Sequence, residues 1–583
     1  MINEYRTLTS RRHSRVKILM VKHTNGERKM PEETEEKFNL LSFCEEAVSL
    51  LIMAYLFIVF SFYPFYMQNG YVEIGDAKFS FYKEITLGGF ALIVPLAVIS
   101  MMLRYRETKS IVRYKTLSVT DCAFLFYGVA VVLSYFFSEF KQEAFWGEKG
   151  WYMGLATQLL FILSYFLVSR FWEYEEKLLL AFMAASAGIF LLGLLNRFSV
   201  YPIVIEGANR EFISTMGNIN WYCGYFAVLF PIGFVWYWIT DKKWIKAAGA
   251  FYVLLGIATG VSQGSSSAFI VIPALYLLLF CLSFRSLKRM KSLFELAFLF
   301  CAACQALRIW RLYLPESFDY YDGSLSDWIT MSHATLYAMV PLAVVYLLML
   351  LAEKKKHMDI TRYKMLRQII LLVLIIAAGV YVMLLIFNTR SRDGIRFMGG
   401  QQILIFSEYW GSSRGGTWSA GIGVFQEMPG LRKLVGAGPD CFASYLYTLP
   451  DVTEKVMDQF GTSRLTNAHN EWLTVLVNNG ILGLIGYAGI FLSVWLRFIY
   501  RAEKVTAELK NKLPDDSRQL LLYAFAASAI AYTAHNIVSF QQILSTPFIF
   551  LLMGMGERLM KEGKKQNNHI EINDKEQLFD DKH

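Results

Sequence analysis

Long apolar runs recur along the chain and limit the folds that it can adopt. About fourteen stretches approach the ~20 residues that a helix needs to cross the hydrocarbon layer of a bilayer. Hydrophobic residues make up 55% of the 583 residues, which is more apolar material than a water-soluble core requires. The sequence therefore predicts an all-α, polytopic bundle of transmembrane helices.

The expected spans divide the chain into five parts. Their cores lie at 47–67, 86–103, 119–137, 154–171, 177–195, 221–240, 246–262, 266–284, 293–312, 333–352, 368–387, 471–497, 519–540 and 544–559. We expect about twelve to fourteen of them to cross the membrane. The parts are a polar N-terminal tail over 1–44, spans one to eleven over 45–387, a large and partly helical loop over 388–470, spans twelve to fourteen over 471–560, and a charged C-terminal tail over 561–583.

Basic residues gather in every second connection, which predicts the orientation of the helices. Their clusters begin at Arg104, Lys242, Arg285, Lys354 and Arg501. Because cytoplasmic loops carry an excess of Lys and Arg, we expect these loops and both termini in the cytoplasm, and the 388–470 loop outside. The net charge of +9 then reflects contact with anionic membrane lipids, and no nucleic-acid partner is expected.

The interiors of the expected spans carry almost no charged side chains. The exceptions lie near span ends: Asp121, Arg308, Arg311 and His535. Ion-coupled transporters place ionisable groups near the bilayer midplane, where they mark a pathway. Asn478 and Asn479 lie inside the twelfth span and are interpreted as hydrogen-bonding residues between helices. The pattern therefore makes a secondary transporter a weaker interpretation than a membrane enzyme.

Cysteines and carboxylates give no sign of a disulfide framework or a metal centre. Of seven cysteines, only Cys441 is expected clearly outside the membrane. Asp319, Asp322 and Asp327 share an outer loop, but their spacing matches no standard cation-binding loop, and a hydrated turn is the preferred interpretation. We therefore expect neither a metal nor a cofactor.

The 388–470 loop gathers arginines, aromatics and a histidine beside the membrane. Arg414 precedes a predicted helix in which Trp418, Ile422 and Phe425 recur at helical spacing. A Gly-Ala-Gly-Pro turn at 436–439 then leads into a second predicted helix over 440–447, whose N-terminal N–H groups are candidates for binding an anion. The loop ends in Asn-Ala-His-Asn at 467–470, directly before the next span.

The order of these residues resembles the O-antigen ligase and polymerase family. The matching positions are Arg414, Trp418, the 436–438 Gly-Ala-Gly turn, His469-Asn470, Leu473 and the 479–483 Asn-Gly-Ile-Leu-Gly run. Upstream, Gly-Asn-Ile-Asn at 217–220 is similar to the family's Gly-Asn-Pro-Asn signature. Where members often carry Ser-Arg-Gly, this chain has Ser-Gln-Gly at 262–264, so one expected phosphate ligand is missing. The resemblance covers roughly residues 215–490.

The resemblance implies a metal-independent, inverting glycosyltransferase in the bacterial cytoplasmic membrane. Such an enzyme transfers a saccharide from a polyprenyl-diphosphate carrier to a hydroxyl acceptor at the outer face. The acceptor is a lipid-anchored sugar or another carrier-linked glycan, and the product contributes to cell-surface polysaccharide. Ligase and polymerase share the donor and are not separated by the sequence.

Two residues receive candidate catalytic roles from this resemblance. Arg414 is expected to hold the departing diphosphate through charge-assisted hydrogen bonds. His469 is expected to accept the proton of the attacking hydroxyl or to donate to a phosphate. Further substrate-binding candidates are Arg392, Arg464, Asn218, Asn220, Asn470 and Trp418. For each of these, the alternative is an ordinary ion pair or a structural contact.

Two other functions fit the same sequence. A transporter or flippase of a lipid-linked oligosaccharide would also be polytopic, although neither internal repeats nor a cationic central cavity are evident in the sequence. A protein O-oligosaccharyltransferase would use the same donor with a protein hydroxyl as acceptor.

Overall fold

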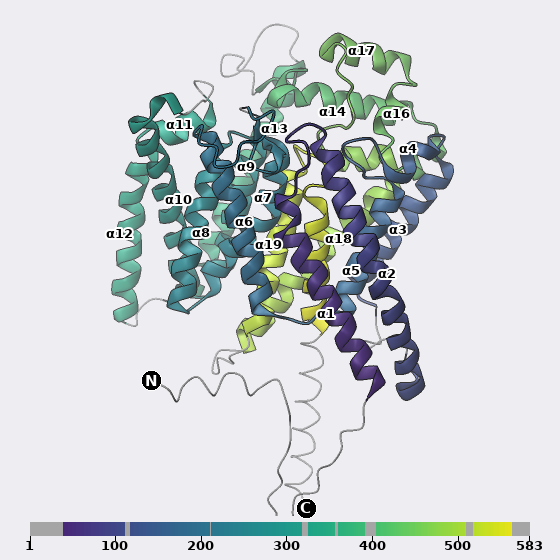
Figure 1. Cartoon of the computed structure of the whole chain (residues 1–583). Helices are drawn as coiled ribbons and strands as arrows, with labels where there is room; N and C mark the ends of the chain where they lie inside the picture. Colours follow the sequence, from purple (N-terminus) through teal and green to yellow (C-terminus); the bar gives the residue numbers. More distant parts are fainter. Residues whose placement is uncertain are drawn as a thin grey trace, which may run out of the picture. The chain divides into compact units, whose positions relative to one another are not determined.

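Almost every described residue belongs to a helix or to a short connection between helices (Figure 1). The computed structural model describes residues 39–110, 117–209, 211–317, 324–355, 359–390, 404–508 and 517–561. Within these ranges the strands are β1 (Phe212–Ile213) and β2 (Gly217–Asn218), which pair antiparallel with Phe212 opposite Asn218. The predicted all-α class is confirmed.

The helices follow one another with short connections. The long helices are α1 (Leu40–Ser61), α2 (Ile74–Thr108), α3 (Val119–Phe137), α5 (Leu155–Phe171), α6 (Glu176–Arg197), α7 (Ile219–Ile239), α8 (Lys243–Ser262), α9 (Ser266–Ser283), α10 (Leu287–Tyr313), α12 (Ala334–Lys354), α13 (Lys364–Arg390), α14 (Trp410–Glu427), α18 (Glu471–Glu508), α19 (Leu521–His535) and a last helix over 546–561. The shorter helices are α4 (Lys141–Trp146), α11 (Leu325–Met331), α15 (Gly430–Val435), α16 (Phe442–Leu446) and α17 (Pro450–Phe460). Single 3-10 turns are η1 (Tyr63–Phe65), η2 (Pro315–Ser317), η3 (Ile360–Tyr363) and η7 (Ser517–Leu520).

Eleven of the described helices are long and apolar enough to cross a membrane. Two more apolar helices, Leu155–Phe171 and Leu521–His535, are shorter, and a further helix covers 546–561. This composition is compatible with an integral membrane protein. Each expected span overlaps one of these helices, but the count of about fourteen crossings stays a prediction, because only eleven helices meet the length and composition of a span.

The centre of the bundle is built by α7, α18 and α19. α7 packs against α19, α8 and α9, and α18 packs against α3 and α19. In α7, 94% of the most apolar window is buried, whereas in α13, the most apolar helix, none of it is. A helix that is apolar on all sides is either buried in a core or surrounded by lipid. We therefore assign α7 to the protein core and the surface of α13 to lipid contact.

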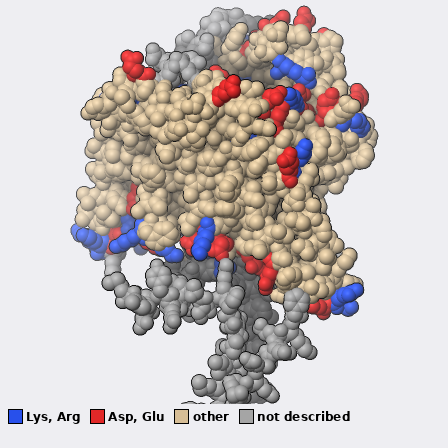
Figure 2. All heavy atoms as spheres, viewed as in Figure 1, with Lys and Arg blue, Asp and Glu red and all other residues tan. Residues whose placement is uncertain are grey.

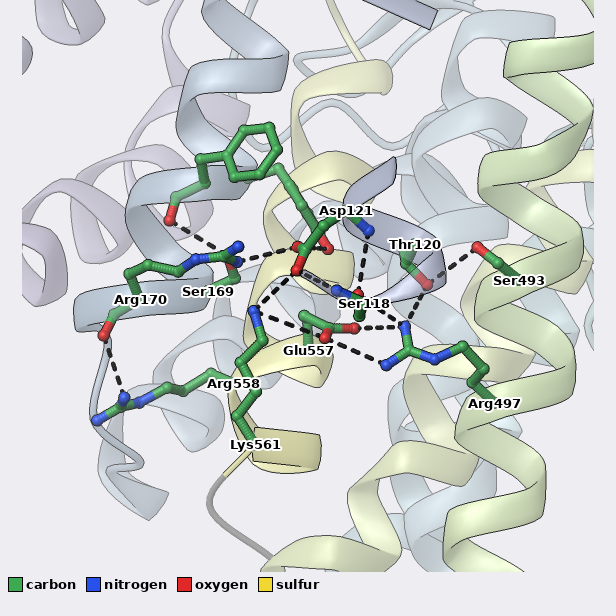
Figure 3. A network of polar contacts seen from close by, with 12 residues as sticks. Ser118, Thr120, Asp121, Ser169, Arg170, Ser493, Arg497, Glu557, Arg558 and Lys561 are labelled. Carbon is green, nitrogen blue, oxygen red and sulfur yellow. Dashed lines mark hydrogen bonds and ion pairs between the residues drawn. The ribbon is translucent and has the colours of Figure 1, made fainter. Parts of the chain in front are cut away.

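Charged side chains gather at the two ends of the helices. The face in Figure 2 shows a broad uncharged belt between two zones that contain Lys, Arg, Asp and Glu. At one end, fully buried Asp121 pairs with Arg170 (2.9 Å) and Lys561 (3.1 Å), as Figure 3 shows. Fully buried Glu557 pairs there with Arg497 (2.7 Å). Carboxylates withdrawn from water are thus compensated by cations.

Removing one partner of this network is expected to destabilise the fold. Asp121→Asn leaves Arg170 and Lys561 without their shared carboxylate, and breaking a buried pair costs about 3–5 kcal/mol. We expect a clear fall in the thermal unfolding midpoint of the purified protein. The control is Asp241→Asn, whose pair with Lys288 is about half exposed and should contribute less than about 1 kcal/mol. Equal midpoints for the two variants would contradict this interpretation of the network.

Candidate functional site

Residues from distant parts of the sequence meet around Arg414 and His469. The elements that contribute are α14, the segment before α18, the connection between α19 and the last helix, and the first turn of α7. In Figure 1, α14, α16 and α17 lie at one end of the long helices. We call Arg414, His469 and His535 the arginine–histidine site.

Arg414 is held in a buried position by an unusual turn. Gly411, Ser412 and Ser413 all have left-handed backbone conformations, with φ of 62°, 61° and 65°. Ser rarely adopts this region, so the turn is strained and must be supported by its surroundings. It reverses the chain immediately before the guanidinium, and the regular part of α14 begins at Arg414. The side chain is only 8% exposed.

Among the described residues, the guanidinium of Arg414 bonds only to backbone carbonyls. Its Nε donates to the Val538 carbonyl (2.9 Å) and its Nη1 to the Gly411 carbonyl (2.7 Å). Among the described residues, no carboxylate pairs with it. Burial lowers its pKa from the ordinary value. A buried cation that lacks a counter-charge is a favourable place for an anionic ligand.

His469 also occupies a left-handed backbone position, with φ of 47°. Its N–H donates to Asn467 Oδ1 (3.0 Å), and its ring packs edge-to-face on Phe540 at 5.3 Å between centroids. The side chain is partly exposed, and its ring nitrogens bond to no described residue. Burial, followed by the positive charge of Arg414, lowers the pKa of His469 to about 4. The imidazole is therefore neutral at pH 7 and able to accept a proton.

His535 is a third member of the site that the sequence reasoning did not select. It is the last residue of α19 and is fully buried, and neither ring nitrogen has a hydrogen-bond partner in the part of the chain that the structure describes. It interacts electrostatically with Arg414. Gly224 of α7 leaves room for it, because a Cβ there would lie 3.1 Å from His535 Nε2. The sequence does contain a signal for His535, because it is an ionisable residue near the end of an expected span.

The two asparagines of the Gly-Asn-Ile-Asn run have structural roles at the start of α7. Asn218 caps the helix by accepting the N–H of Asn220 (2.9 Å). Asn220 Oδ1 accepts a hydrogen bond from Ser265 Oγ (2.8 Å), and Ser265 in turn caps α9. These contacts attach the beginning of α7 to the 262–265 turn.

A row of aromatic rings connects this helix end to His469. Trp221 packs edge-to-face on Trp151 (5.4 Å), Trp151 on Phe540 (4.8 Å), and Phe540 on His469. The two motifs of the sequence, although far apart along the chain, therefore lie at the same end of the bundle.

Arg197 lies beside the 262–264 turn, where this chain has Ser-Gln-Gly in place of the family's Ser-Arg-Gly. Gln263 is fully buried and donates to Thr259 Oγ1 and Ser262 Oγ. Arg197, at the end of α6, donates through Nε to the Ser262 carbonyl (2.9 Å). It also interacts electrostatically with Cys223 in the first turns of α7. An arginine from another helix is thus adjacent to Gln263, which sequence spacing alone does not reveal.

The remaining candidates separate into structural and exposed residues. Asn470 Oδ1 accepts the N–H of Leu473 (3.1 Å) at the start of α18. Trp418 packs against Trp410, and its buried indole N–H has no acceptor among the described residues. Arg464 is exposed and pairs with Glu148 (3.1 Å), which is the ordinary alternative for a loop arginine. Arg392 lies outside the described residues.

The Gly-Ala-Gly turn at 436–438 packs against α18. The N–H groups of Ala437 and Gly438 donate to the carbonyls of Val477 and Asn478, just before a kink at Gly480 (φ 68°). The predicted helix over 440–447 is the shorter α16, Phe442–Leu446. The N–H groups of the turn itself therefore bond to the protein, and anion binding at the N-terminal N–H groups of the following helix stays a prediction.

The side chain of Asp440, which follows this turn, lies in the protein interior. Its Oδ2 accepts the N–H groups of Glu148 (2.8 Å) and Met153 (2.9 Å). Burial raises the pKa of Asp440 to about 7. Asp440 was not selected from the sequence, because a carboxylate in a long loop is usually solvated.

Clusters of typical metal ligands do not occur in the part of the chain that the structure describes. No three His, Cys, Asp or Glu side chains gather there. Asp327 pairs with Arg311 (2.8 Å), and Asp319 and Asp322 lie outside the described residues.

Comparison with protein-family models finds no match to this chain, and comparison with curated proteins finds none. The resemblance to the O-antigen ligase and polymerase family therefore rests on the motifs quoted above.

The proximity of Arg414 and His469 can be measured through the pKa of the imidazole. In protein with labelled histidine, NMR should give a midpoint near pH 4 for His469, identified by its loss in His469→Asn. Arg414→Gln removes a nearby positive charge, so the midpoint should rise towards the ordinary value. Arg464→Gln, which alters an exposed and already neutralised ion pair, should leave it unchanged. An unchanged midpoint in Arg414→Gln would contradict the assigned geometry.

Proposed function

We propose that this protein is a glycan transferase of the outer face of the bacterial cytoplasmic membrane, with a polyprenyl-diphosphate-linked saccharide as donor and a hydroxyl group as acceptor. One observation carries the proposal: buried Arg414 has no carboxylate partner among the described residues and lies close to the neutral, unbonded imidazole of His469. A cation and a base are thereby available at one end of an apolar bundle.

Arg414 and His469 suit the two charge changes of glycosyl transfer: the negative charge that develops on the departing diphosphate, and the proton that leaves the acceptor hydroxyl. The acceptor oxygen attacks the anomeric carbon, and the bond from that carbon to the diphosphate oxygen breaks. The diphosphate departs with the bonding electrons, and Arg414 stabilises its growing negative charge. The hydroxyl proton passes to His469. A single displacement of this kind inverts the configuration at the anomeric carbon.

Further polar groups lie around the first turns of α7. His535 faces Gly224, and its ring nitrogens bond to no residue that the structure describes. Arg197 interacts with Cys223 and is attached to the 262–265 turn through Ser262. In this proposal, Arg197 supplies the phosphate contact that Gln263 cannot. The two phosphates of the carrier would then have separate cationic partners.

An apolar groove near the same turn suits the lipid chain of the donor. The groove has a volume of about 510 Å³ and is lined by side chains of α9, α10, α11 and α12. Val261, the neighbour of Ser262, contributes to its wall. A polyprenyl chain needs an apolar path that starts close to its diphosphate, and the contact of this groove with Val261 supports it as that path.

The transporter alternative is less well supported by the distribution of charge. Buried ionisable residues such as Asp121, Lys78 and Glu557 lie in the terminal turns of their helices and bond to neighbouring protein groups. A pathway for an ion would instead need ionisable residues near the midplane. A protein O-oligosaccharyltransferase remains a second enzyme candidate, because it differs only in its acceptor.

Transfer activity tests the proposed site. Purified protein in lipid receives a polyprenyl-diphosphate glycan and, in parallel, lipid-linked sugar, carrier-linked glycan or a Ser/Thr-containing protein as acceptor. We expect turnover with one of these acceptors. Arg414→Ala should lower kcat about 100- to 1,000-fold, as for loss of one oxyanion donor. His469→Ala should lower it about 100-fold or more.

Arg464→Ala serves as the matched control, because Arg464 belongs to the same loop but is exposed and paired. Its turnover should stay within about twofold of wild type. Turnover that survives both Arg414→Ala and His469→Ala would refute the site. Movement of the lipid-linked glycan across vesicles without any transfer would favour the transporter.

Orientation is tested by cysteine labelling in a cysteine-free background. Lys455 lies exposed on α17, and Lys355 lies exposed after α12. A membrane-impermeant maleimide should label Lys455→Cys on intact cells and Lys355→Cys only after the membrane is opened. The reverse pattern would place the arginine–histidine site in the cytoplasm and contradict the proposed location.

A further inference from the structure

Arg308 is a cation near the end of an apolar helix, and no carboxylate of the described chain compensates it. Its Nη2 lies 2.8 Å from His333 Nε2, and this imidazole is its one hydrogen-bond partner among the described residues. An arginine stays protonated, so the imidazole nitrogen accepts the bond and adds no negative charge. Arg311, one turn later on α10, instead pairs with Asp327 (2.8 Å). An uncompensated cation near a span end is a candidate for binding an anion.

Arg308 lies on the face of α10 that lines the apolar groove of about 510 Å³. Cys301 of the same helix contributes to the groove wall. Seven residues make close to two helical turns, so Arg308 lies above Cys301 on one face, about 10.5 Å farther along the axis. From α12, Ala334 lines the groove directly after His333. The contact between Arg308 and His333 therefore links α10 to α12 at one end of the groove.

The lining of the groove is almost wholly apolar. Its two hydroxyl groups already have partners: Tyr276 Oη donates to the Leu296 carbonyl (2.7 Å), and Thr335 Oγ1 accepts from Gln305 Nε2 (2.7 Å). A sugar or a peptide in such a groove would lose hydrogen bonds to water without replacing them, whereas a hydrocarbon chain loses none. The groove therefore suits an apolar chain, and the cation at its end suits an anionic headgroup.

The charged end of the groove lies beside the residue proposed to contact the carrier diphosphate. Phe198, which follows Arg197, stacks on Trp310 of α10 with 4.0 Å between the ring centroids. Val261 lines the groove, and Arg197 donates to the carbonyl of the next residue, Ser262. In Figure 1, α11 lies at the same end of the long helices as α14 and α17. A lipid in the groove is thus adjacent to the proposed transfer site.

We propose that the groove and Arg308 form a docking site for a polyprenyl carrier, with its chain in the groove and its terminal phosphate on Arg308. A guanidinium binds phosphate through charge-assisted, often bidentate hydrogen bonds. Burial of the chain removes apolar surface from contact with the surroundings and adds packing contacts. The identity of the lipid rests on the proposed function, because the groove adjoins Arg197. The carrier is held here before its diphosphate reaches Arg414.

Equilibrium binding of a radiolabelled polyprenyl monophosphate to the full chain in detergent tests the docking site. This probe carries no saccharide, so transfer cannot consume it. We expect one saturable site per chain. Arg308→Gln should weaken binding about 10- to 100-fold, as for loss of a charge-assisted hydrogen bond. Polyprenol, which lacks the phosphate, should bind wild type and Arg308→Gln with equal affinity, which shows that the groove itself is intact in the variant.

Ala338→Trp tests the apolar part of the site. Ala338 lines the groove, so an indole at this position should occupy part of it and weaken binding of both polyprenyl phosphate and polyprenol about tenfold or more. The matched control on α12 is Val340→Trp, because Val340 is 64% exposed and lies outside the groove lining. The matched control on α10 is Arg311→Gln, because Asp327 already neutralises Arg311. Both controls should stay within about twofold of wild type.

Unchanged affinity for polyprenyl monophosphate in Arg308→Gln or in Ala338→Trp would overturn the docking site. Equal displacement of the probe by phosphatidylglycerol would overturn the assignment to a polyprenyl carrier, and displacement by inorganic phosphate alone would overturn the role of the groove. Saturable binding that depends on Arg308, in protein that performs no glycan transfer, would support the docking site and contradict only the proposed reaction. Transfer with an unchanged donor KM in Arg308→Gln would contradict only the docking site.

Discussion

A charge that is withdrawn from water must find a partner, and this requirement distinguishes the two ends of the bundle. At one end, the carboxylates of Asp121 and Glu557 are surrounded by arginine and lysine side chains that neutralise them. At the other end, Arg414, Asp440 and Glu471 are also buried, and they bond to backbone groups without an oppositely charged partner among the described residues. The buried charges of the first end are thus compensated within the protein. Those of the second end are not, and the proposed site rests on this difference.

The backbone at the second end explains how these groups are held there. Left-handed residues at Ser412 and Ser413 precede Arg414, and His469 is itself left-handed. Conformations that are rare for non-glycine residues persist only where neighbouring contacts stabilise them. α18 provides many of these contacts, because its kink at Gly480 receives the 436–438 turn and its first turn follows His469. The arrangement keeps Arg414 and His469 close without a direct bond between them.

The sequence predicts the helices well, because a span is a local property. Each apolar run overlaps a helix, and the start of α7 is visible in the cap formed by Asn218. The site is predicted only in part. Arg414 and His469 stand out through a resemblance of motifs, whereas His535 reaches α7 from α19, and Arg197 of α6 reaches Ser262 at the end of α8. The positions of these two side chains depend on how the helices pack. That packing cannot be inferred from the spacing of residues in the sequence. For the same reason, the motifs do not reveal that Asn218, Asn220 and Asn470 form helix caps or links between helices. Their substrate-binding role stays a prediction.

The central claim is that the arginine–histidine site receives the diphosphate of a lipid carrier. The most direct measurement is a cryo-electron microscopy structure of the full chain in lipid with a non-transferable phosphonate analogue of a polyprenyl-diphosphate glycan. Phosphate density should lie within about 3.2 Å of a guanidinium nitrogen of Arg414, with the sugar next to the His469 ring. Phosphate density elsewhere, with Arg414 still bonded only to the carbonyls of Gly411 and Val538, would contradict the account.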